Sequence, residues 1–136
     1  MAGNYISLPG VTAGADYSTI ATVGAADAAT VGQYLAVYLS ADRTVSRQTS
    51  DGGVCCGILQ NNPASGAAAD VAAVGIAKAK YGATVTIGQM LKAEVTTSRL
   101  IPVAAAADYA IAQAIVAGAD HDVVDVLLIH AGRDSD

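Results

Sequence analysis

The sequence predicts an all-β fold, a small β-sandwich or barrel of about eight short strands. Glycine or a cluster of turn residues recurs along most of the chain, from Gly10 to Gly118. The apolar runs between these points are about 5–9 residues long, which suits strands better than helices of 10–12 residues or more. Within Gln33–Leu39, tyrosine or alanine at the even positions alternates with leucine or valine from position 35 onward. This period of two indicates a sheet with two distinct faces.

Eight segments have the length and composition of strands. In chain order, the predicted strands are Ser18–Val23, Gln33–Leu39, Thr44–Arg47, Val54–Gln60, Asp70–Lys80, Met90–Val95, Tyr109–Val116 and Asp122–His130. The first four lie between glycines or turn clusters such as Asp51-Gly52-Gly53 and Asn61-Asn62-Pro63. In the fifth, Lys78 and Lys80 share one parity, and Ala77 and Ala79 have the other. Both lysines are therefore expected to face the same side, toward solvent.

The segment Ala104–Val116 allows two interpretations. Residues 104–107 are four consecutive alanines, and alanine has the highest helix propensity of any residue, which favours a helix. However, Ile111, Gln113 and Ile115 alternate with alanine, which is a strand period. We expect a strand here, with at most a short helical turn near residues 102–107. The segment Asp122–His130 is rich in β-branched residues and leucine and predicts the last strand.

The ends of the chain differ from its centre, and three regions are expected: an N-terminal arm (1–16), a β-domain (17–130) and a polar C-terminal tail (131–136). The arm has no charge before Asp16, whereas a free flexible arm would be polar. It is either an edge strand docked on its own domain or a segment that buries Tyr5, Ile6 and Leu8 against a neighbouring chain. Tyr5, Ile6, Leu8 and Pro9 are the candidate contact residues.

Composition and charge exclude several classes of protein. The 136 residues are 53% hydrophobic and only 14% charged, with a net charge of −5 and two cysteines. The chain is therefore too apolar to be disordered, too poor in cysteine to be a disulfide scaffold, and too acidic to bind nucleic acid. The longest uncharged run, Gly52–Ala69, contains Gln60-Asn61-Asn62-Pro63, so it does not predict a membrane span. The first ten residues lack the basic and apolar regions of a signal peptide.

Catalytic chemistry is hard to assemble from these residues. The chain has two histidines, one glutamate (Glu94) and no recognisable Ser/His/Asp motif, so no catalytic residue and no cofactor are predicted. The cluster Asp120-His121-Asp122, with Asp125 nearby, has residue types that bind divalent cations. Along a strand, His121 would face away from both neighbours, so only a loop would bring them together. We interpret the cluster as a polar turn and predict no metal site.

The remaining reactive side chains have simple interpretations. The adjacent Cys55 and Cys56 are expected to be buried or half-buried thiols in a reducing cytoplasm. His130 ends an apolar run and is expected at a strand terminus. The seven basic residues are spread from Arg43 to Arg133 without a cluster.

The composition instead favours contact with other proteins. Alanine (30 residues) and glycine (14) dominate, and phenylalanine and tryptophan are absent. Small side chains bury little apolar area each, and few charges leave apolar surface uncovered, which is typical of interfaces. Oligomerisation or docking on a large partner would cover that surface.

One stretch resembles a known family. The segment Gly57-Ile-Leu-Gln-Asn-Asn-Pro63, then Gly66, the Val71…Val74-Gly75 step, Val85…Gly88 with Met90-Leu91, Ile111-Ala112 and Val123…Val126-Leu127 resemble tailed-bacteriophage capsid decoration (cement) proteins. The resemblance covers roughly Tyr17 to Ile129, and "GILQNNP…G" is its most distinctive part.

The resemblance implies a non-enzymatic, all-β virion protein on the outer capsid surface. Such a protein would be made in the host bacterial cytoplasm, would form a homotrimer, and would stabilise the capsid by bridging subunits of the major capsid protein. Neither nucleic acid nor a membrane is an expected partner. The alternative from another class is a small β-barrel module that binds a ligand or carbohydrate. Metal-dependent hydrolysis at the Asp120 cluster is a third and weaker hypothesis.

Overall fold

The computed structural model describes residues 4–20 and 27–132. Within these ranges the chain forms ten strands and no helix, which confirms the all-β prediction. The strands are β1 (Asn4–Ser7), β2 (Thr12–Ala13), β3 (Ala36–Ala41), β4 (Thr44–Arg47), β5 (Gly57–Leu59), β6 (Val71–Lys80), β7 (Met90–Ala93), β8 (Leu100–Pro102), β9 (Ala110–Ala114) and β10 (Val123–Gly132). They belong to one sheet that does not close into a barrel.

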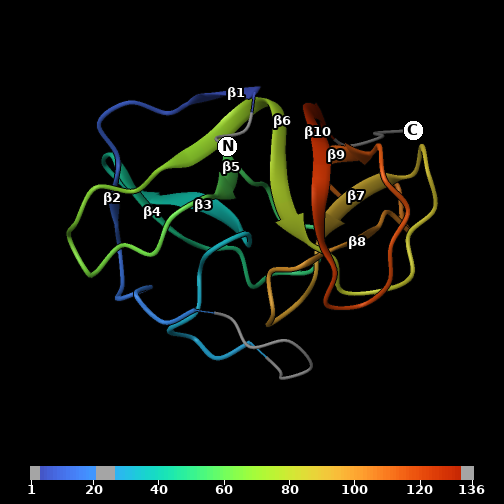
Figure 1. The fold of residues 1–136 in the computed structure, drawn as a ribbon. Helices are drawn as coiled ribbons and strands as arrows, with labels where there is room; N and C mark the ends of the chain where they lie inside the picture. The colour runs from blue at the N-terminus through green and yellow to red at the C-terminus, as the bar shows by residue number, and fades with distance from the viewer. Residues whose placement is uncertain (1–3, 21–26, 133–136) are drawn as a thin grey trace.

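The sheet forks at β6 (Figure 1). Ala72 pairs with Ser7 of β1 on one edge of β6 and with Ile58 of β5 on the other. Three residues later, Gly75 pairs with Tyr5 of β1 and with Leu128 of β10. Because β1 keeps one edge throughout, β5 and β10 must share the opposite edge. One half of the sheet therefore continues through β5, β3, β4 and β2, and the other through β10, β9, β7 and β8.

Gly75 lies where β6 changes partners and turns downward beside β10 (Figure 1). Its φ is 109°, a conformation that residues with a side chain rarely adopt. A Cβ atom at this position would lie 2.4 Å from the carbonyl oxygen of Asn4 in β1. Glycine therefore allows both the bend in β6 and the close approach of β1.

The described residues form two apolar cores. The larger core lies mainly under β6, β10, β9 and β7 and also takes in Ala36 of β3 and Ile58 of β5; its largest members are Tyr81, Ile58, Leu91, Leu100, Ile111 and Leu128. The smaller core lies among β2, β3, β4, β5 and the start of β6 and includes Val37, Val45, Leu59 and Val71. Because the chain has no phenylalanine or tryptophan, both cores consist mainly of aliphatic side chains and tyrosine.

The structure decides the alternatives for Ala104–Val116. Residues 110–114 form β9, so the expected strand is confirmed, and the backbone N–H of Asp108 donates to the carbonyl of Ala105 in a turn before it. Ser18 and Thr19 form only isolated bridges to Val31, and residues 21–23 of the predicted strand Ser18–Val23 lie outside the described residues. The strands β1, β2 and β8 were not among the eight predicted segments.

One orientation predicted for β6 is wrong. Lys78 is exposed, but Lys80 is only 2% exposed and forms an ion pair inside the protein. The strand ends at Lys80, and its backbone N–H donates to the carbonyl of Tyr34. The chain around Asp27 and Tyr34 therefore covers this face of β6 at Lys80, whereas the same face is open to solvent two residues earlier, at Lys78.

Candidate functional site

The described strands place the four candidate contact residues on two sides of the N-terminal segment. Tyr5 is half-buried against the larger core, and its hydroxyl donates to Oδ2 of Asp70 at 2.7 Å. Leu8 packs against the smaller core. Ile6 and Pro9 are exposed. Residues 4–7 therefore form an edge strand on their own domain, and Ile6 points away from that domain. At the other end, Ala131 and Gly132 of the expected tail belong to β10.

Ile6 belongs to an outward-facing apolar surface, which we call the β1–β6–β10 face. It consists of Ile6, Val74, Ile76, Leu127 and Ile129. Ile6 is the register partner of Val74, and Ile76 is the register partner of Leu127. Ile6 is 70% exposed and Val74 50%. The exposed Lys78–Asp125 ion pair, at 3.5 Å, lies on the same two strands beyond Ile76 and Leu127. Exposed apolar groups gathered on one face are typical of interaction surfaces.

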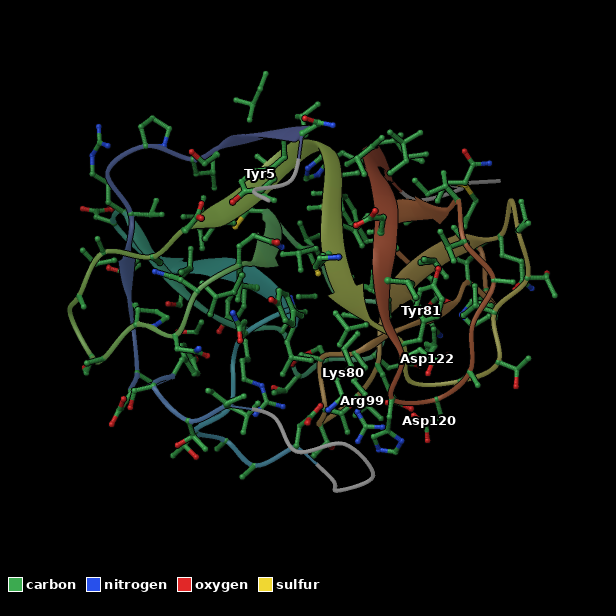
Figure 2. The ribbon with its side chains drawn as sticks, viewed as in Figure 1. Tyr5, Lys80, Tyr81, Arg99, Asp120 and Asp122 are labelled. Atoms are coloured by element: carbon green, nitrogen blue, oxygen red, sulfur yellow. The ribbon has the colours of Figure 1, made fainter. Side chains whose placement is uncertain are left out.

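A second feature is a buried ionic network centred on Asp27. One carboxylate oxygen of Asp27 lies 2.9 Å from Nζ of Lys80, and the other lies 2.9 Å from Nε of Arg99. Arg99 also reaches Oδ1 of Asp120 at 2.8 Å. Figure 2 shows Lys80, Arg99 and Asp120 gathered where the lower ends of β6 and β10 meet. The buried carboxylate of Asp27 therefore forms ion pairs with two cations.

Arg47, at the end of β4, is buried next to this network and pairs with no carboxylate among the described residues. Its guanidinium donates to the carbonyls of Ala28 and, at 2.8 Å, Thr96. Its Nε donates to Oγ of Ser98 at 3.4 Å. Burial lowers the pKa of Arg47, whereas the negative charge of Asp27 opposes that shift. The neutral acceptors hold the charge in place without neutralising it.

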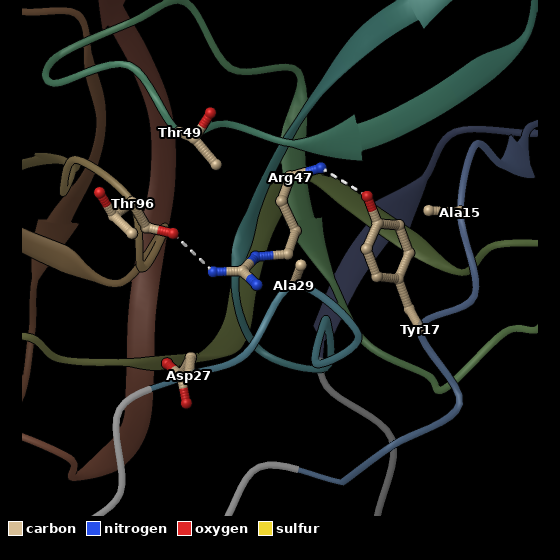
Figure 3. Close-up of a pocket in the computed structure, with 7 residues that line it drawn as sticks. All are labelled: Ala15, Tyr17, Asp27, Ala29, Arg47, Thr49 and Thr96. Atoms are coloured by element: carbon tan, nitrogen blue, oxygen red, sulfur yellow. Dashed lines mark hydrogen bonds between the residues drawn. The ribbon is translucent and has the colours of Figure 1, made fainter.

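A cavity of about 470 Å³ opens beside Arg47 (Figure 3). Tyr17 lies on one side of Arg47, with its hydroxyl accepting the Arg47 backbone N–H at 3.0 Å. Thr96 lies on the other side. The described residues that line it are Ala15, Tyr17, Asp27, Ala29, Arg47, Thr49 and Thr96. A pocket of this size with a few polar groups has the dimensions of a ligand site.

The backbone of Thr96 is strained at the edge of the cavity. The N–H of Thr97 donates to the carbonyl of Val95 at 2.8 Å, which closes a γ-turn with Thr96 at its centre. The φ of Thr96 is 69°, and γ-turns with positive φ are rare and strained, above all for a β-branched residue. Two hydrogen bonds hold this geometry: the N–H of Thr96 donates to the carbonyl of Thr49, and its carbonyl accepts from Arg47.

Comparison with solved structures shows a similarity in fold. The fold matches a bacteriophage head fibre base. The crystal structure of the head fiber gp8.5 N base in bacteriophage phi29 aligns with 90% of this chain and 92% of its own, with a TM-score of 0.62. The sequences are 9% identical, so the match is one of fold. No protein-family model and no curated protein matches the sequence.

The acidic cluster near the last strand forms a polar turn, as predicted. Asp120 and His121 lie in the turn, and Asp122 accepts the backbone N–H of Ala119 at 2.8 Å. Asp120 pairs with Arg99, and Asp125 pairs with Lys78. Within the described ranges, no three histidine, cysteine or acidic side chains form a group that could hold a metal ion.

The two cysteines have the predicted burial, whereas His130 lies within β10, which continues to Gly132 and does not end at His130 as predicted. Cys55 is buried, Cys56 is half-buried, and both are free thiols whose pKa values burial raises to about 12 and about 11. His130, in β10, lies between the hydroxyl of Tyr109 and the carbonyl of Ala73. No helix in the described part of the chain is long and apolar enough to span a bilayer.

Sequence reasoning missed the network around Asp27. Three basic residues that the sequence scatters, Arg47, Lys80 and Arg99, converge on this site through the fold. One signal was present: Asp27 is the only charged residue between Asp16 and Asp42, in a stretch rich in alanine. A lone charge in such surroundings indicates a buried partner, because an unpaired charge in an apolar interior is strongly unfavourable.

Proposed function

We propose that this chain is a structural protein of a bacteriophage virion, a decoration or cement protein on the outer surface of the head. The match in fold to a phage head fibre base over 90% of the chain is the main support. The "GILQNNP…G" resemblance to decoration proteins is independent of that match. In the proposed role the protein is non-enzymatic and acts without a cofactor.

We further propose that the protein binds the major capsid protein through the β1–β6–β10 face. This face presents aliphatic side chains from three adjacent strands, which fits a contact made by burying apolar area. The strands are held rigidly by the sheet, so little conformational entropy would be lost on docking. Ile6 is the most exposed member and is proposed as its central contact.

A homotrimer is the proposed form of the protein on the capsid. The accessible surface of the chain is 6235 Å². A compact monomer of this mass is expected to expose about 6,500 Å². The protomer is therefore well packed alone, and trimer formation would join folded protomers. A trimer that contacts several capsid subunits at once multiplies modest affinities through effective concentration.

Binding to phage heads that lack this protein tests the proposal. Wild-type protein and the variants Ile6→Asp and Val74→Asp would be added to such heads, which are then pelleted to measure bound protein. Ile87→Asp is the matched control, because Ile87 is 72% exposed but lies outside this face. We expect wild type and the control to bind and to raise the temperature at which heads rupture, and both face variants to lose binding. Equal binding of all four proteins would contradict the assigned face, and absence of wild-type binding would contradict the proposed role.

A further inference from the structure

We propose that the cavity beside Arg47 is a binding site for a carboxylate group, and that an aspartate or glutamate side chain of a partner protein supplies it. The inference rests on the charge, the hydrogen-bond donors, the strain and the size of the cavity. It does not depend on the virion role, so the two proposals can fail separately.

The charge around the cavity is unbalanced. Arg47, Lys80 and Arg99 contribute three cations, and Asp27 and Asp120 contribute two carboxylates. Both oxygens of Asp27 are already used by Lys80 and Arg99, so the excess positive charge lies at Arg47. Buried charges in proteins are usually paired. A monoanion in the cavity would complete the pairing.

The cavity offers hydrogen-bond donors. A guanidinium has five N–H groups, and the described acceptors of Arg47 are two carbonyls and one hydroxyl, which leaves two N–H groups. The hydroxyl of Tyr17 accepts from the Arg47 backbone, so its proton remains available. Thr49 and Thr96, two exposed residues that carry hydroxyl groups, also line the cavity. Such a lining fits a ligand rich in acceptors, and the guanidinium fork matches a carboxylate.

Asp27 selects among anions. Its carboxylate lines the same cavity, so a doubly charged phosphate would meet more repulsion than a singly charged carboxylate. The single positive charge in excess also matches a monoanion. The chemistry of the site therefore favours a carboxylate.

The strained turn is a separate indication of a binding role. Residues held in sparsely populated backbone conformations concentrate at ligand sites, where the surrounding structure holds them in place. Here the γ-turn places Thr96 at the edge of the cavity, and Arg47, the proposed ligand-binding cation, holds that turn through the Thr96 carbonyl. The strained backbone of Thr96 and the uncompensated charge of Arg47 are therefore joined by a hydrogen bond.

The size and walls of the cavity favour a protein side chain over a sugar acid. The volume of 470 Å³ exceeds what a carboxylate alone fills, so a flanking chain also fits. Ala15 and Ala29 are the smallest side chains of the lining and take up little of that space. Sugar sites usually offer an exposed aromatic face, but Tyr17 is only 4% exposed.

Nuclear magnetic resonance titration of the full chain tests this inference. The probes are glutamate blocked at both ends, the equally blocked glutamine, and glucuronate. We expect blocked glutamate to cause saturable shifts at the amides of Tyr17, Thr49 and Thr96 and at Nε of Arg47, and blocked glutamine to cause none. No saturable shift up to about 100 mM, where even a weak contact registers, would overturn the proposal. Equal shifts with blocked glutamine would also overturn it, and tighter binding of glucuronate would overturn the assignment to a protein partner.

Variants separate a binding role from a structural one. Thr49→Val and Thr96→Gly each remove a lining hydroxyl, and glycine tolerates the positive φ of residue 96, so both should fold. Each should weaken binding of blocked glutamate about tenfold, the effect of losing one hydrogen bond to a charged group. Thr84→Val, at an exposed threonine outside the cavity lining, is the control and should bind like wild type. Unchanged affinity in both cavity variants would overturn the proposal.

Discussion

Nζ of Lys80 lies 2.9 Å from Oδ1 of Asp27, and the side chains of both residues are almost completely buried. The two residues are 53 positions apart in the sequence. Arg99 binds the second oxygen of the same carboxylate, so Asp27 is the only acid in contact with two buried cations within the described network. This arrangement joins the chain around Asp27 to β6 and to the residue before β8.

Replacement of Asp27 should destabilise the protein strongly. The variant Asp27→Ala leaves Lys80 and Arg99 buried without their shared partner, and we expect a loss of about 3–5 kcal/mol in the free energy of unfolding. Urea denaturation followed by circular dichroism measures it. The matched control is Asp125→Ala, which removes the exposed partner of Lys78 and should cost less than about 1 kcal/mol. Similar costs for the two variants would show that Asp27 does not hold the network together.

Gly75→Ala should detach β1 from the sheet. The added Cβ would meet the Asn4 carbonyl at 2.4 Å, and the φ of 109° is itself unfavourable for alanine. Gly66→Ala is the control, because Gly66 also has a positive φ but has open space around it. The control should cost about 1–2 kcal/mol from the backbone alone. Hydrogen exchange should show faster exchange in β1 for Gly75→Ala only, and equal protection of β1 in both variants would contradict the assigned contact.

Stability at acid pH should depend on Asp108. A hydrogen bond from Lys92, 2.9 Å away, lowers the pKa of Asp108 below its ordinary 3.8; burial opposes this, and the N–H groups of Ala104 and Ala105 add to the lowering. Because the folded pKa is below the unfolded one, this stabilisation is present above pH 3.8 and is lost as the pH falls through the folded value. In the variant Asp108→Asn, the free energy of unfolding should therefore fall less steeply than in wild type as the pH decreases below 3.8. Lys92→Met should show the same shallower fall, and an unchanged slope in both variants would refute the assignment.

The phenol of Tyr5 should lose its proton only at a pH well above that of an ordinary tyrosine. Burial, and then the hydrogen bond to Asp70, raise its pKa from 10.0 to about 12. Since the folded state holds the phenol proton more tightly, its contribution to stability is complete below pH 10 and declines as the pH rises toward 12. The difference between ultraviolet titrations of wild type and Tyr5→Phe isolates this group, with circular dichroism confirming the fold at each pH. A difference curve centred near pH 10 would contradict the contact with Asp70.

The strands could be predicted because their information is local. The alternation of residues 33–39 and the glycine-bounded runs correspond to β3, β5, β6, β9 and β10. Lys80 shows the limit of this approach: its parity is that of the exposed Lys78, but a distant segment around Asp27 covers the end of the strand. Parity defines the face of a side chain, whereas burial depends on which segment lies above that face.

The candidate site was less predictable, for the same reason. Arg47 and Thr96 are 49 positions apart, and neither is unusual in its local sequence. Their contact depends on the approach of the turn between β7 and β8 to the chain after β4, where the N–H of Thr96 donates to the carbonyl of Thr49, and no local pattern specifies that approach. The N-terminal residues were identified from their apolar character, yet only the pairing of β1 with β6 separates Tyr5, which packs inward, from Ile6, which faces outward.

The fork at β6 also has a consequence for synthesis of the chain. As the polypeptide leaves the ribosome, β1 has no partner until residues 71–80 have emerged. The second half of β6 then has an unpaired edge until β10, close to the C-terminus, becomes available. The half of the sheet formed by β10, β9, β7 and β8 therefore cannot finish before residues 123–132 have emerged, whereas all strands of the other half lie before residue 81. Because long-range pairings form late and slowly, the two halves are expected to fold one after the other, and β10 is expected to complete the second half.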